Sequence, residues 1–159
     1  MRAANFFWVF LLLIGVSCQV ASSSRPNNLK EQEEVEIVLR TFYGMAVDYN
    51  YSGMRQQCSK DFVFEESGQE WTLEQLILLL EHEKVNHTVI SHRIDSIDTK
   101  ISYPYAWIHF QNHAVSFKGK DTIVSFRKAS AALKATEGSW KMFRVESEKQ
   151  FGKDRISVL

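Results

Sequence analysis

Residues 59–76 have the sequence SKDFVFEESGQEWTLEQL, which combines the features of a strand, a chain break and the start of a helix. Residues 62–65 are rich in bulky apolar side chains, as is typical of a short strand, and Gly68 ends it. Thr72 and Gln75 have the spacing of a capping box, in which each side chain binds a backbone N–H at the start of a helix. The stretch therefore predicts a strand followed directly by a helix.

The segment before this stretch has the pattern of an amphipathic helix over residues 31–49. Its apolar side chains recur every three or four positions, which places them on one face. They are Val35, Val38, Leu39, Phe42, Met45, Ala46 and Tyr49. A second, short helix is expected to follow through Cys58, with Ser52 as its cap.

The segment after the stretch changes to a β pattern beyond residue 85. Four runs are expected to be strands: 86–97, 105–117, 122–134 and 140–147. Turn sequences at 119–120 and 137–139 join the last three as hairpins. Helices followed by a strand meander predict an α+β fold, in which a curved antiparallel sheet wraps around the N-terminal helix and leaves a cone-shaped cavity.

Composition limits the domain count and the partners. The 159 residues, of which 45% are apolar, suffice for one domain with a real core. Lys+Arg and Asp+Glu both number 19, and basic clusters are absent. Neither nucleic acid nor an anionic lipid surface is therefore an expected partner.

The N-terminus has the pattern of an export signal, because Arg2 precedes a short apolar run over residues 6–16. We expect a signal peptide at 1–18, a flexible linker at 19–30, one domain at 31–150 and a C-terminal tail at 151–159. Residues 15–18 (GVSC) resemble a bacterial lipobox, which would make Cys18 a lipidation site. Ordinary cleavage is the alternative.

The expected location is outside the cytoplasm. In a bacterium the chain would be periplasmic or a membrane-anchored lipoprotein, with the lipid as its sole membrane contact; otherwise it would be secreted. Glycosylation sequons begin at Asn50 and Asn86 and matter only in a eukaryote. Cys58 would be the single remaining thiol, so no internal disulfide is expected.

Four segments taken in order resemble one known family: 38–42 (VLRTF), 59–68, 71–76 and 138–145 (GSWKMFRV). They are similar to the SnoaL-like, ketosteroid-isomerase-like branch of the nuclear transport factor 2 (NTF2-like) superfamily. The resemblance implies a cone-shaped fold and a homodimer paired through exposed sheet faces. It spans isomerases and dehydratases as well as modules with no known chemistry.

The resemblance implies an incomplete isomerase site. Glu66 occupies the place of the carboxylate base, whereas Phe42 matches the donor tyrosine, with Tyr43 one residue away. Val124 matches the protonated aspartate of that family. Because two of the three roles are missing, we expect a non-catalytic module that binds an apolar small molecule or mediates protein association.

The alternative is a small lyase or isomerase. Some dehydratases of this fold pair a histidine with a carboxylate, and His109, mid-strand between Ile108 and Phe110, is the candidate partner of Glu66. No metal or cofactor is expected, because His109 and His113 lie about 13 Å apart along one strand. Expected ligand-binding residues are Phe42, Tyr43, Trp71, Tyr105, Trp107 and Arg144.

We predict that the mature chain begins between Cys18 and Ser23, because the short apolar run is followed there by small and polar residues. N-terminal sequencing and intact mass of protein from its native host would test this. A product that retains Met1 would contradict the prediction, and an added lipid mass would select the lipoprotein alternative.

Overall fold

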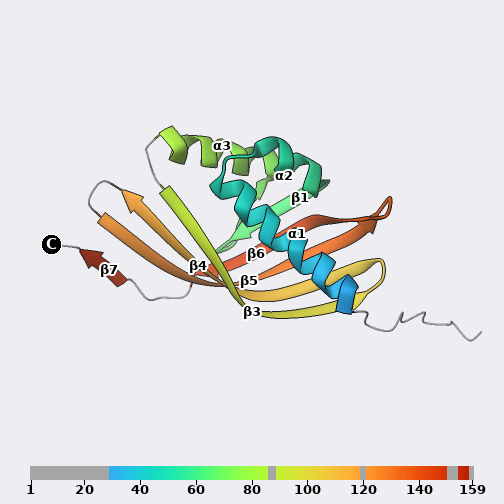
Figure 1. The fold of residues 1–159 in the computed structure, drawn as a ribbon. Helices are drawn as coiled ribbons and strands as arrows, with labels where there is room; N and C mark the ends of the chain where they lie inside the picture. The colour runs from blue at the N-terminus through green and yellow to red at the C-terminus, as the bar shows by residue number, and fades with distance from the viewer. Residues whose placement is uncertain (1–28, 86–88, 119–120, 150–153, 158–159) are drawn as a thin grey trace, which may run out of the picture.

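The computed structural model describes residues 29–85, 89–118, 121–149 and 154–157 (Figure 1). The predicted signal peptide, Cys18 and the sequon at Asn86 lie outside these ranges. The elements in chain order are α1 (Leu29–Val47), α2 (Tyr51–Gln57), β1 (Cys58–Glu66), β2 (Gln69–Thr72), α3 (Leu73–Val85), β3 (Val89–Ser102), β4 (Tyr105–Lys118), β5 (Asp121–Thr136), β6 (Ser139–Lys149) and β7 (Asp154–Ser157).

The strands form one sheet in the order β2-β1-β6-β5-β4-β3, and β7 pairs with β5. Neighbours are antiparallel except for β1 and β6, which run parallel. Hairpins make the pairs β1–β2, β3–β4, β4–β5 and β5–β6 antiparallel, whereas β1 and β6 are far apart in sequence and are free of this constraint. The predicted α+β fold, with a helix against a curved sheet, is confirmed.

The core lies between α1 and the inner face of the sheet. Figure 1 shows all three helices on this one face. Val35, Leu39 and Phe42 of α1 are at most 2% exposed, as the helical stripe predicts. They pack in one cluster with sheet residues, which include Ile108, Leu133, Met142 and Val145.

Alternation along the strands separates the two faces of the sheet. The buried side chains of β4 and β5 occupy every second position: Ala106, Ile108, Phe110, Asn112 and Ala114, then Ala129, Ala131 and Leu133. The residues between them, such as Tyr105 and Trp107, are exposed on the outer face. This alternation decides which of the predicted site residues lie on the inner face of the sheet, beneath the helices.

The capping box predicted for α3 is confirmed. The Thr72 backbone N–H donates to the Gln75 side chain at 2.9 Å, and the Gln75 N–H donates to the Thr72 hydroxyl at 3.4 Å. The predicted cap of α2 is wrong, because Asn50 and not Ser52 accepts the Gly53 N–H, at 3.0 Å. Among the described residues, no helix combines the length and apolarity needed to cross a bilayer.

Candidate ligand cavity

A cavity of about 240 Å³ lies between α1, α3 and the inner face of the sheet. Its helical wall consists of Phe42, Tyr43 and Ala46 from α1, and Leu76, Leu79 and Leu80 from α3. Its sheet wall consists of Phe64, Glu66, Trp71, His92, Asn112, Ala114, Ser116, Ser125 and Arg127. Leu79 is 45% exposed, so the helical wall is partly open to solvent. The cavity therefore has an apolar wall of helices opposite a sheet wall that carries polar groups.

An ion pair joins Arg127 of β5 and Glu66 of β1 inside this cavity. The two strands are not neighbours, since β6 lies between them. About a quarter of each side chain is exposed, 25% for Arg127 and 27% for Glu66. Arg127 Nη1 contacts Glu66 Oε1, while Arg127 Nε is buried without a hydrogen-bond partner. The carboxylate is thus neutralised, and the guanidinium keeps a donor to spare.

His92 and Asn112 form a second polar pair on the sheet wall. His92 Nδ1 lies 3.1 Å from Asn112 Oδ1, and Asn112 is 2% exposed. Because an amide oxygen only accepts, Nδ1 carries the proton and Nε2 is left as an acceptor. Burial lowers the pKa of His92; the hydrogen bond to Asn112 opposes this, and the charge of Arg127 adds to it. His92 is therefore neutral at neutral pH.

Tyr43 places its phenol next to these groups. Its ring centroid lies 5.0 Å from that of His92, 5.8 Å from Phe110 and 5.6 Å from Phe42. Burial raises the pKa of the Tyr43 phenol far above its usual range; the charge of Arg127 opposes the shift and that of Glu66 adds to it. The hydroxyl therefore stays protonated and can donate a hydrogen bond.

The predicted site residues divide between the two faces of the sheet. Phe42, Tyr43, Glu66 and Trp71 line the cavity. His109 follows the outer phase of β4, because its neighbours Ile108 and Phe110 are the residues that face the core. Glu66 and His109 therefore lie on opposite faces, and the predicted acid–base pair is not brought together.

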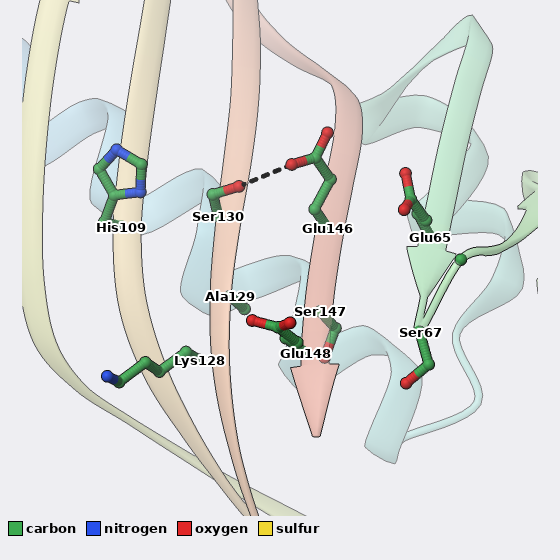
Figure 2. A pocket seen from close by; sticks show the side chains of 10 residues that line it. Glu65, Ser67, His109, Lys128, Ala129, Ser130, Glu146, Ser147 and Glu148 are labelled. Atoms are coloured by element: carbon green, nitrogen blue, oxygen red, sulfur yellow. Dashed lines mark hydrogen bonds between the residues drawn. The ribbon is translucent and has the colours of Figure 1, made fainter. Parts of the chain in front are cut away.

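His109 lines a separate groove of about 370 Å³ on the outer face, with Glu65, Lys128, Ser130 and Glu146 among its other residues. Figure 2 shows these side chains in front of the sheet, with the helices behind it. Ser130 Oγ donates to Glu146 Oε2 at 3.4 Å. This groove shares no lining residue with the inner cavity.

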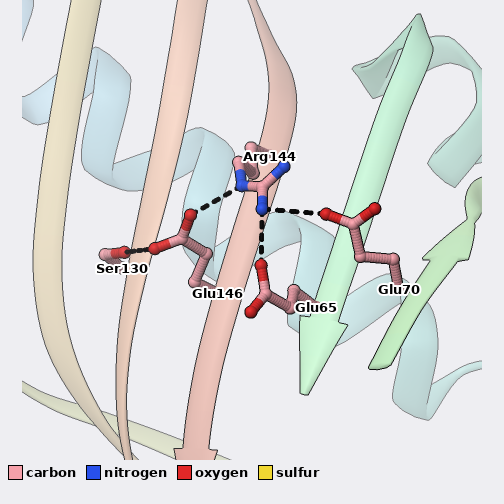
Figure 3. A network of polar contacts seen from close by, with 5 residues as sticks. All are labelled: Glu65, Glu70, Ser130, Arg144 and Glu146. Carbon is pink, nitrogen blue, oxygen red and sulfur yellow. Dashed lines mark hydrogen bonds and ion pairs between the residues drawn. The ribbon is translucent and has the colours of Figure 1, made fainter. Parts of the chain in front are cut away.

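The other predicted ligand contacts, Tyr105, Trp107 and Arg144, also lie on the outer face. Arg144 donates to three carboxylates, at 2.6 Å to Glu146, 2.5 Å to Glu65 and 3.0 Å to Glu70 (Figure 3). These bonds raise the pKa of Arg144, that to Glu146 most, although partial burial opposes them. The guanidinium is held by carboxylates outside the cavity rather than aimed into it.

The polar cavity residues His92, Asn112 and Arg127 were not among the predicted site residues. The inward position of Asn112 and Arg127 could have been predicted from the alternation of side chains along their strands. Asn112 has the phase of Ile108 and Phe110, and Arg127 has the phase of the buried residues of β5. A polar side chain in the apolar phase of a strand is the sign of a buried polar group.

Metal and thiol chemistry have little support in the part of the chain that the structure describes. No group of three or more His, Cys, Asp or Glu side chains that could hold a metal ion is found there. Cys58 is buried, which raises the pKa of its thiol to about 12 although the charge of Lys141 opposes the shift. A protonated, buried thiol is a packing residue rather than a nucleophile.

Comparisons of this chain with known proteins find solved structures of the same fold, but no family model and no curated protein sequence that matches it.

Solved structures with the same architecture come from several bacteria. An NTF2-like protein from Cytophaga hutchinsonii is 11% identical with a TM-score of 0.66, covering 76% of this chain and 98% of its own. A protein of unknown function with a cystatin-like fold from Nostoc punctiforme is 9% identical with a TM-score of 0.63, covering 79% and 95%. The beta subunit of benzoate 1,2-dioxygenase from Burkholderia mallei is 15% identical with a TM-score of 0.65, covering 74% and 89%. The chain therefore has the NTF2-like fold that its sequence resembles.

We predict that the free energy of unfolding falls as the pH is lowered through about 6.5, and that His92 causes part of this fall. The lowered pKa of folded His92 means that the unfolded chain takes up the proton first. The contribution of the neutral His92 ring to the free energy of unfolding is therefore fully present when the pH is above the pKa of His92 in the unfolded chain. It is lost as the pH falls toward the pKa of His92 in the folded protein.

Urea unfolding of the wild type and of His92→Gln between about pH 7.5 and 5 would measure this. The glutamine amide can still donate to Asn112 but does not titrate. The wild type should lose more stability than the variant over this range. A difference between the two proteins that stays constant with pH would contradict the prediction.

Proposed function

We propose that this protein binds a small, largely apolar and uncharged molecule that carries one hydrogen-bond acceptor. The helical wall supplies the apolar surface, from Phe42 to the leucines of α3. The polar groups opposite carry no net charge, because Arg127 is paired with Glu66 and both His92 and Tyr43 are neutral. A charged ligand would be desolvated there without a counter-charge, which is costly.

The observation that carries this proposal is the buried Arg127 Nε–H, which has no hydrogen-bond partner. A buried donor left unsatisfied costs free energy, and a ligand acceptor would remove that cost. Asn112 strengthens the argument, because it lines the cavity and its amide oxygen contacts His92, so the group that it can offer a ligand is its NH₂ donor. An acceptor such as a carbonyl oxygen suits this wall.

Binding without turnover is favoured because Glu66, the residue in the place of a base, is held by Arg127. One observation favours the alternative of a lyase or isomerase. Neutral His92 presents Nε2 as an acceptor in the same cavity as Glu66, so a base would be His92 and not His109. We propose that either activity takes place outside the cytoplasm, as the signal-peptide pattern predicts.

We predict that 2-acetylnaphthalene binds more tightly than 2-ethylnaphthalene, which has nearly the same shape but lacks the acceptor. A hydrogen bond from a charged donor contributes about 1.5–3 kcal/mol, so the ketone should bind about 10-fold to 100-fold more tightly. Isothermal titration calorimetry on the full chain would give both affinities. Equal affinities, or binding of neither compound, would contradict the proposal.

The variant for this test replaces both members of the ion pair, Glu66→Leu with Arg127→Leu. Replacing both avoids leaving one charge unpaired in the cavity. The preference for the ketone should become markedly smaller while 2-ethylnaphthalene still binds. Arg144→Leu is the matched control, because Arg144 is an arginine of the same sheet on its outer face. That variant should keep the full preference.

We further propose that the protein forms a homodimer through the outer face of the sheet. Tyr105 and Trp107 are 37% and 41% exposed there, and their rings lie 6.0 Å apart. The ring of Phe143 extends the patch, 6.2 Å from that of Tyr105. Neighbouring exposed aromatic side chains of this kind are typical of protein interfaces.

Sedimentation at micromolar concentration should therefore show twice the mass of the mature chain. Trp107→Lys should shift the protein to monomer, because it places a charge at the centre of the patch. Leu78→Lys is the matched control, since Leu78 is 64% exposed on α3 and lies on the other side of the sheet. A wild-type protein that sediments as a monomer would refute the dimer.

A further inference from the structure

A second hollow of about 390 Å³ lies directly beside the ligand cavity, in a groove between α1 and β3. Tyr43 and His92 line both the groove and the cavity. Their ring centroids are 5.0 Å apart. The two rings are therefore a partition one side chain thick between two spaces that would otherwise be continuous.

The groove stays open at α1 because Gly44 stands there. A Cβ atom added to Gly44 would meet no other atom within 4 Å. Glycine has a low helix propensity, and the sequence places it in the interior of a helix. The missing side chain leaves unfilled space on the far side of the partition.

The groove favours an apolar chain over an anion. Val47 and Ile94 lie among its walls. Its two arginines already have partners, because Arg40 donates to the Ile94 carbonyl at 3.1 Å and Arg93 pairs with Asp95 at 2.8 Å. The groove also carries the carboxylate of Asp48, which would repel an anion.

The two halves of the partition are held with different strength. Tyr43 is 7% exposed and contacts three rings, those of Phe42, His92 and Phe110. His92 is half-buried and is held by one side-chain hydrogen bond, to Asn112. His92 is therefore the half that can move at the lower cost.

We propose that His92, backed by Tyr43, determines the length of ligand that the protein accepts. With the rings together, a ligand ends at the partition. With His92 displaced, the cavity continues into the groove between α1 and β3, which takes the apolar chain of a longer ligand. This inference rests on the proposed function, since it concerns the same ligand in the same cavity.

The test uses unbranched methyl ketones of increasing chain length, titrated calorimetrically into the full chain. Wild-type affinity should rise about fourfold for each added methylene group until the chain fills the cavity, and then level off. In His92→Ala the rise should continue to longer ketones. His92→Ser provides a second, more polar opening of the same partition should the alanine variant fold poorly.

Two controls distinguish a cavity that has been joined to the groove from a cavity that has only been enlarged. Leu80→Ala enlarges the cavity at its α3 wall, away from the groove, and should extend the length limit by no more than about the three carbons that the side chain loses. Adding Gly44→Trp to His92→Ala fills the groove from α1 and should restore the wild-type limit. Gly44→Trp alone should leave the limit unchanged.

The outcomes distinguish this inference from the function on which it rests. If no ketone binds the wild type, the proposed function fails. If ketones bind but the length limit of His92→Ala equals that of the wild type or of Leu80→Ala, the partition has no role and this inference alone is overturned. An unchanged limit after filling the groove in the double variant would overturn it as well.

Discussion

The burial of one face of α1 against the inner face of the sheet is the contact on which the rest of the structure depends. Val35, Leu39 and Phe42 are almost fully buried, and each such side chain stabilises the fold by about 1.5–3 kcal/mol. Toward its C-terminal end the same helix, with α3, lines the cavity rather than closing against the sheet. The core and the candidate site are thus two parts of one helix–sheet interface.

Local patterns predicted most of this architecture, because helix periodicity, the capping box at Thr72 and the turn at Gly138 are properties of neighbouring residues. Gly138 has a φ of +79°, the left-handed conformation that glycine tolerates at a turn. Local patterns could not predict which face of the sheet each side chain of β3 occupies. Its register shifts between Asp95 and Asp98, so His92 and Thr99 both face inward although they are seven positions apart, a spacing that places two residues of a regular strand on opposite faces.

The candidate site depends on contacts that no local pattern contains. Glu66 was predicted from its place after the first strand, but its partner Arg127 lies on a strand that is not its neighbour. His109 drew attention because apolar residues flank it, yet strict alternation places it on the face opposite to theirs. Asn112, in phase with those apolar neighbours, reaches the cavity instead.

The polar cluster is better explained by recognition than by stability. A buried ion pair seldom stabilises a fold more than well-packed apolar residues of similar size would. The remainder of the inner face shows that the fold is built on such apolar residues, among them Ile108, Leu133 and Val145. Polar residues line the cavity, and the buried Nε of Arg127, on the same wall, has no hydrogen-bond partner. The physical cost of the cluster is therefore the argument for assigning the cavity a binding function.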